Sequence, residues 1–183
     1  SLEATRFISQ PKLDGSALSL EYRKGRLVRA ATRGSGDRGE DVTKNARRVE
    51  NVPHTLGIEV DVHIRGEVVM RKSTFKERYA DVSPNPRNLA AGALRQKKAE
   101  GKANASDLVF LAYDAKFPPE SLRHPDSTLP PDAENDSEIL SWLSEIAGVR
   151  PAPWVTTESN DADSLSIGLC KETEKWANDR SEY

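Results

Sequence analysis

The stretch Gln10-Pro11-Lys12-Leu13-Asp14-Gly15 lies between two strand-like runs, residues 6–9 and 18–22. Asp-Gly favours a tight connection between antiparallel strands, so the sequence predicts that Lys12 sits on stiff backbone with its amine projecting. A lysine held in this way can act as a covalent nucleophile when desolvation or cationic neighbours favour its neutral form. The alternative is an ordinary turn beside a surface lysine, because a Lys-x-Asp-Gly match also arises by chance.

The composition is that of one polar globular domain. The chain has 183 residues, of which 31% are charged and 36% are hydrophobic, and its net charge is −2. Nucleic-acid contacts would therefore have to come from local basic clusters. The single cysteine, Cys170, excludes an internal disulfide and a multi-cysteine zinc site. No apolar run is long enough for a membrane span, and the histidines show no ligand spacing. We expect a cytoplasmic monomer without membrane contacts and without a protein-held metal.

A third strand and a glycine-rich loop follow. A Lys24-Gly25 turn leads into residues 26–33, so antiparallel pairing would bring Arg33 back to the sheet that carries Lys12. Residues 34–39 contain three glycines, and a helix is predicted over residues 40–49. The loop lacks the Gly-Lys-Ser/Thr ending of a Walker loop. It could hold a ligand, or it could be a surface loop with a helix cap.

Glu67 is a carboxylate placed between Gly66 and an apolar run, within an extended stretch predicted to run from residue 58 to residue 70. A partly buried carboxylate needs a partner. A ribose hydroxyl, a metal ion or an arginine would serve. The simplest alternative is an ion pair with Arg65 or Arg71.

A later helix offers two arginines. Asn85 and Pro86 predict a helix start, and the helix should run to residue 96. Arg87 and Arg95 are eight residues apart and so lie on roughly one face, where they would suit phosphate contacts. The alternative is a solvated charged face.

The remaining segments complete an α+β pattern. Residues 107–115 predict a buried strand, residues 116–135 a surface connection, and residues 137–147 and 161–180 two amphipathic helices. The expected fold is therefore α+β, with antiparallel β-sheets and flanking helices.

In their order along the chain, these stretches resemble the adenylation (nucleotidyltransferase) domain of NAD-dependent bacterial DNA ligases. The similarity covers roughly residues 6–115. The matching stretches are Lys12-Leu13-Asp14-Gly15, Ala31-Thr32-Arg33-Gly34, Gly39-Glu40-Asp41-Val42-Thr43, Arg65-Gly66-Glu67-Val68 and residues 85–96. The resemblance implies the ATP-grasp-like nucleotidyltransferase core of DNA ligases.

The resemblance also implies a mechanism. Lys12 would attack the α-phosphate of NAD and form a lysyl-AMP intermediate, with Mg²⁺ stabilising the phosphates and Asp14 orienting the lysine or the metal. AMP would then pass to the 5′-phosphate of nicked double-stranded DNA, during replication and repair. By the same resemblance, the nucleotide would contact Gln10, Leu13, Arg33 and Glu67, and phosphates of DNA or dinucleotide would contact Arg87 and Arg95.

Several departures qualify the resemblance. Gln10 stands where the family has a glutamate that contacts adenine, and Ser35 stands where it usually has aspartate. We expect residues 1–183 to be one adenylation domain, truncated before the last nucleotide-binding motifs and weak or inactive without the other ligase domains. Two further readings stay open: an ATP-dependent polynucleotide ligase, and a non-catalytic nucleic-acid-binding module.

Overall fold

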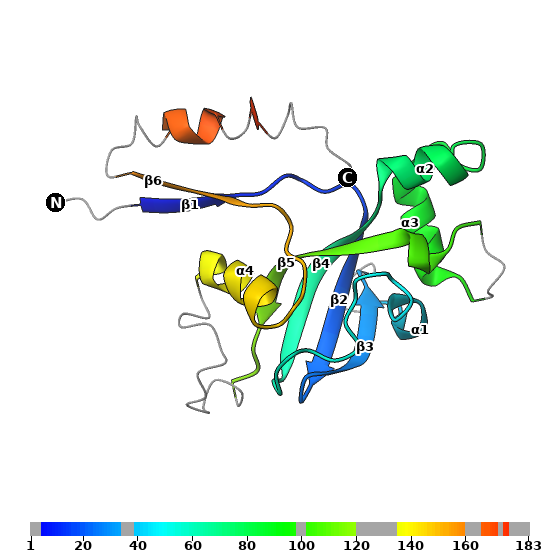
Figure 1. Cartoon of the computed structure of the whole chain (residues 1–183), viewed down its shortest axis with the longest axis horizontal. Coiled ribbons are helices and arrows are strands. Elements are labelled where there is room, and N and C mark those ends of the chain that lie inside the picture. The colour runs from blue at the N-terminus through cyan, green and yellow to red at the C-terminus, as the bar shows by residue number, and fades with distance from the viewer. Residues whose placement is uncertain are drawn as a thin grey trace.

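The computed structural model describes residues 5–33, 39–97, 102–119, 135–159, 166–171 and 174–175. Its strands form two antiparallel sheets, a two-stranded sheet of order β1-β6 and a four-stranded sheet of order β3-β2-β4-β5 (Figure 1). The strands are β1 (Thr5–Ser9), β2 (Ser16–Arg23), β3 (Arg26–Thr32), β4 (Val62–Met70), β5 (Leu108–Lys116) and β6 (Val155–Ser159). The predicted α+β class with antiparallel sheets is confirmed.

Alternating side chains give the four-stranded sheet one core face. In β2, Leu18, Leu20 and Tyr22 are buried, whereas Ser19 and Glu21 between them are partly exposed. The central strand β4 has the same alternation over most of its length. Because successive side chains of a strand point to opposite faces, this pattern buries one face of the sheet beneath the helices.

The helices are α1 (Thr43–Ala46), α2 (Lys72–Arg78), α3 (Pro86–Arg95), the 3₁₀ helix η1 (Ala105–Asp107) and α4 (Asp136–Glu145). α3 begins as predicted: the Asn85 side chain accepts a hydrogen bond from the Asn88 amide at 2.9 Å, and Pro86 occupies the first helical turn. α3 packs on β4 and β2 (Figure 1). Its Leu89 and Leu94 join the main core. In the part of the chain that the structure describes, no helix is long and apolar enough to cross a membrane.

The outer edge of β5 is covered. The Asn51 side chain donates to the Phe110 carbonyl at 2.7 Å and accepts from the Phe110 amide at 2.8 Å. Further along, the Ala112 amide donates to the Arg150 carbonyl at 2.9 Å, and the Ala152 amide donates to the Ala112 carbonyl at 2.6 Å. These contacts satisfy the backbone groups that an edge strand leaves unpaired.

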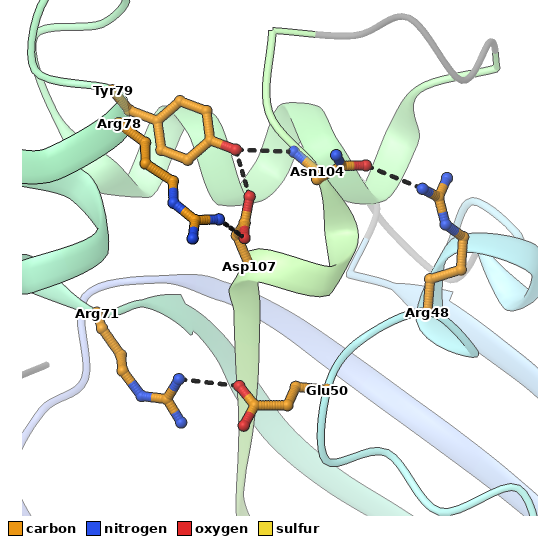
Figure 2. A network of polar contacts seen from close by, with 7 residues as sticks. All are labelled: Arg48, Glu50, Arg71, Arg78, Tyr79, Asn104 and Asp107. Atoms are coloured by element: carbon orange, nitrogen blue, oxygen red, sulfur yellow. Dashed lines mark hydrogen bonds and ion pairs between the residues drawn. The ribbon is translucent and has the colours of Figure 1, made fainter.

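A polar network joins the end of α2 to η1 and to the segment after α1 (Figure 2). The Tyr79 hydroxyl donates to the Asp107 carboxylate, and Arg78 pairs with the same carboxylate at 2.8 Å. Arg48 donates to the Asn104 side chain at 2.9 Å. Although α2 has no fully buried residue, Phe75 and Tyr79 pack against the main core, and this network adds polar contacts that hold its carboxyl end to the rest of the domain.

The predicted hairpin between residues 6–9 and 18–22 is wrong. β1 pairs with β6 instead, with Arg6 opposite Glu158, 152 residues further along the chain. Gln10–Gly15 therefore connects two different sheets and does not turn within one. A local pattern identifies a strand, but it does not identify a partner so distant in sequence.

Other boundaries also differ from the prediction. The helix expected over residues 40–49 is reduced to α1, because Glu40 and Val42 still make backbone hydrogen bonds to β3, at Thr32 and Ala30. β4 begins at Val62 and not near residue 58. Of the helix predicted over residues 161–180, the described residues 166–171 and 174–175 are helical, and the others lie outside the description.

Gly66→Ala should lower the free energy of unfolding by about 2 kcal/mol, measured by urea denaturation with circular dichroism. A Cβ at Gly66 would overlap the Leu111 carbonyl oxygen and the Phe110 ring, so β4 and β5 would have to move apart.

Gly92→Ala is the matched control. A Cβ at Gly92 meets nothing within 4 Å, and the residue lies inside α3, so alanine should stabilise the domain by about 1 kcal/mol. Equal effects of the two substitutions would contradict the close packing of Gly66.

Candidate active site

A cavity of about 400 Å³ opens where the connector between the two sheets passes β4 and β5. Six of the residues predicted from the sequence line it: Gln10, Lys12, Leu13, Asp14, Glu67 and Arg87. Pro11, Tyr113 and Ala152 line it as well. The structure therefore brings together residues from the amino-terminal connector, the middle of β4, the first turn of α3 and β5.

The connector is anchored on both sides of Asp14. Leu13 packs against a small apolar cluster of Val69, Val109, Leu111 and Ala152. Gly15 is buried against β4, and a Cβ at this position would overlap the Val68 carbonyl oxygen. With Leu13 and Gly15 directed inward, Lys12 and Asp14 remain exposed. This alternation positions the amine without any tight hairpin.

Glu67 is the partly buried carboxylate of the site. Burial raises its pKa above the usual value of 4.5, while the hydrogen bond from the Gly15 amide and the positive charge of Arg87 act in the opposite direction. The alternative expectation, an ion pair between Glu67 and either Arg65 or Arg71, is wrong, because both arginines pair with other carboxylates. Arg65 pairs with Asp114 at 3.8 Å, and Arg71 with Glu50 at 2.8 Å.

Arg87 and Asp14, which both line the cavity, form an ion pair. Their ion pair is 3.2 Å long, and the side chains are 63% and 73% exposed. An ion pair so exposed contributes little to stability. A phosphate ligand can therefore replace Asp14 as the partner of Arg87 at small cost.

Tyr113 is a lining residue that the sequence analysis assigned to a buried strand. In the register of β4 and β5, Arg65 lies opposite Asp114, and the next residue, Gly66, lies opposite Ala112. Tyr113 has no opposite residue in β4 and is therefore the extra residue of a β-bulge. The bulge interrupts the apolar run and leaves Tyr113 38% exposed, where it lines the cavity. Burial and the nearby charge of Glu67 raise the pKa of Tyr113. No periodicity in the sequence marks this bulge.

The other two predicted residues lie outside the set that lines the cavity. Arg33 follows β3, close enough to lower the pKa of Tyr113 in opposition to its burial. Arg95 lies at the far end of α3 and pairs with Glu40 at 3.5 Å. The buried Asn45 side chain donates to the carbonyls of Leu94 and Gln96, at 2.7 and 2.8 Å, and so fixes the backbone around Arg95. Residues 34–38 of the glycine-rich loop, including Ser35, lie outside the described residues.

Glu67→Gln should raise the free energy of unfolding at pH 7 and should bring no gain well below pH 4.5, the usual pKa of glutamate. The folded state binds the Glu67 proton more tightly than the unfolded chain does. Stability is therefore lost as the pH rises from 4.5 through the raised pKa, and removing the carboxylate restores it.

Urea denaturation of both proteins across this pH range measures the difference. Glu59→Gln, at an exposed carboxyl group, controls for the loss of one negative charge. A Glu67→Gln effect of the same size at every pH would contradict the raised pKa.

Comparison with known proteins gives a clear family match. The family model described as "NAD-dependent DNA ligase adenylation domain" matches residues 1–153. A DNA ligase from Rhodopseudomonas palustris strain BisA53 is 41% identical over an aligned length of 177, and the match covers 89% of this chain and 23% of the relative. A DNA ligase from Campylobacter concisus is 50% identical over an aligned length of 119, and the match covers 61% of this chain and 18% of the relative. The chain thus spans about a fifth of the length of such relatives.

Solved structures give more distant likenesses. A mycobacterial DNA ligase D complexed with ATP has a TM-score of 0.46 at 15% identity, over 92% of this chain and 45% of that one. The ATP-dependent DNA ligase of bacteriophage T7 has a TM-score of 0.39 at 15% identity, over 88% and 52%. At these values neither likeness bears on the choice of cofactor. The match over residues 1–153 does decide the family: this chain belongs to the NAD-dependent DNA ligase adenylation domains.

Proposed function

We propose that this domain attaches AMP to Lys12 and so carries out the first step of NAD-dependent DNA ligation. The observation that supports this most directly is that Lys12, Glu67 and Arg87, which are far apart in the sequence, line one cavity of a chain in this family. A cavity of about 400 Å³ is also large enough for part of a dinucleotide.

In the proposed step, the neutral amine of Lys12 attacks the α-phosphorus of NAD. A phosphorus–nitrogen bond forms while the bond from that phosphorus to the bridging oxygen breaks. Nicotinamide mononucleotide leaves with the oxygen and its electron pair, and the amine releases a proton to solvent. Leu13 and Gly15 hold the backbone of the connector in place. The backbone that carries Lys12 therefore needs little reorganisation before the amine reacts.

The other side chains suit the parts of the dinucleotide. Arg87 offers a fork of donors to the phosphates, in exchange for its exposed pair with Asp14. The exposed ring of Tyr113 offers a face on which a base can stack. Glu67 can accept a hydrogen bond from a ribose hydroxyl. Arg33 is close enough to Tyr113 for its charge to affect the pKa of the Tyr113 hydroxyl. Leu13 contributes apolar surface to the wall.

Magnesium would enter this site together with the phosphates. Among the described residues, no three His, Cys, Asp or Glu side chains cluster so that they could hold a metal ion. Mg²⁺ commonly keeps several waters and binds one or two carboxylates plus substrate phosphates. Asp14 and Glu67 are the carboxylates that line the cavity and would take that part. The bound ion would stabilise negative charge on the phosphates.

The later steps would need nicked double-stranded DNA and, given the length of the relatives, further domains of a longer protein. AMP would pass from Lys12 to the 5′-phosphate of the nick, and the 3′-hydroxyl would displace it. Arg95 suits a DNA phosphate, because its pair with Glu40 is 45% and 49% exposed and is easily exchanged. DNA binding should therefore weaken with salt. The family match favours NAD over ATP, and an enzyme over a non-catalytic binding module.

Intact-mass measurement after incubation with magnesium and either NAD or ATP tests the proposal. We expect the mass to increase by one AMP with NAD and not with ATP. Lys12→Ala should abolish the adduct, because it removes the nucleophile. Lys44→Ala, which removes an exposed lysine of α1 outside the cavity, should retain it.

The full-length protein is measured in parallel, because we expect the 183-residue chain to react weakly by itself. An adduct that persists in Lys12→Ala would contradict the role of this lysine. An adduct formed only with ATP would contradict the choice of NAD. No adduct in either the chain or the full-length protein would contradict the proposed activity.

A further inference from the structure

The carboxyl end of α3 carries no glycine cap of its own. The helix ends at Arg95, and Gln96 continues in an extended conformation. The next residue is Lys97, so this end lacks the left-handed glycine that commonly satisfies the last carbonyls of a helix. Those carbonyls have no partner within the helix and need donors from other segments or from water.

Asn45 of α1 supplies donors at this end. Its Nδ2 group donates to the Leu94 carbonyl at 2.7 Å and to the Gln96 carbonyl at 2.8 Å, one residue on each side of Arg95. A carboxamide nitrogen carries two hydrogens and can make both bonds at once. Asn45 is only 8% exposed, so water cannot readily replace these donors if the side chain is removed.

The segment that carries Asn45 is itself attached to β3. The Val42 amide donates to the Ala30 carbonyl at 2.9 Å, and the Ala30 amide donates to the Thr43 hydroxyl oxygen at 2.9 Å. Val42 is also buried in the main core. Residues 40–46 therefore join the edge of the four-stranded sheet to the end of α3.

The same segment holds the side chain of Arg95. The Glu40 carboxylate pairs with the guanidinium at 3.5 Å, and both side chains are about half exposed. Such a pair contributes little to stability, but it orients the arginine toward one side of the helix. With its backbone fixed by Asn45, Arg95 would lose less conformational freedom on contact with a phosphate than an unrestrained arginine would.

We infer that Asn45 is a positioning residue for the contact between Arg95 and a DNA phosphate. In this role Asn45 does not touch the DNA, and it acts through the backbone of Leu94 and Gln96. The inference rests on the proposed function, which assigns Arg95 to DNA. Asn45 and Arg95 should then act as a unit in DNA binding, and residues that only stabilise the fold should not.

A double-mutant cycle in the full-length protein tests this coupling. Fluorescence anisotropy gives the dissociation constant for nicked duplex DNA, without NAD or magnesium so that no sealing occurs. Arg95→Ala should weaken binding by about tenfold and should lower the dependence of log Kd on log salt by about 0.9, because one phosphate contact is lost. In the Asn45→Ala background, Arg95→Ala should weaken binding by less than about threefold, because the arginine is no longer held in place.

Asn51→Ala controls for lost stability. The Asn51 side chain also makes two hydrogen bonds to backbone, but these are to Phe110 of β5. In this background, Arg95→Ala should still weaken binding by about tenfold. Thermal melts verify that each variant is folded, and Asn45→Ser, which keeps one donor in a smaller side chain, replaces Asn45→Ala if that variant does not fold.

Three results would overturn the inference, and they are distinguishable. If Arg95→Ala has its full effect in both asparagine backgrounds, Asn45 has only a structural role, while the proposed DNA contact of Arg95 stands. If the effect is lost equally in both backgrounds, the coupling follows stability and not position. If Arg95→Ala changes neither the dissociation constant nor the salt dependence, the proposed DNA contact of Arg95 fails together with the inference.

Discussion

Gly15 lies so close to the backbone of β4 that no side chain fits between them, and the geometry of the cavity depends on this approach. It brings the Gly15 amide to the Glu67 carboxylate, which would otherwise be a partly buried charge with less compensation. Together with Leu13, it holds the connector at fixed points, so that Lys12 and Asp14 face the cavity. A residue with a side chain at position 15 would shift the connector and the carboxylate together.

The charges of the site are divided between two environments. Glu67 is partly buried, and burial raises its pKa. Groups that donate a hydrogen bond to its carboxylate, as the Gly15 amide does, offset part of that cost. Arg87 and Asp14 form an exposed pair that contributes little to stability and can separate when a ligand enters. For the proposed binding and release of a nucleotide, this division would keep the partly buried Glu67 in place while the exposed pair of Arg87 and Asp14 exchanges partners.

α3 links the cavity to a second region of the surface. Its first turn carries Arg87 to the cavity, and its last turn carries Arg95 to Glu40. The helix packs on the central strands (Figure 1). Asn45 fixes the backbone at its carboxyl end. The two arginines are therefore held at a set separation by a rigid element, which suits contacts to two parts of one extended anionic substrate.

The sequence by itself determined the presence of β1 to β5, the start of α3, and the residue types proposed to carry the chemistry, because alternation, capping and motif order are local properties. Six predicted residues do line one cavity. Only the tertiary structure decided that β1 pairs with β6, that the connector joins two sheets, and that a bulge exposes Tyr113. Those features arise from backbone pairing and close packing between segments far apart in the chain, which local periodicity does not encode.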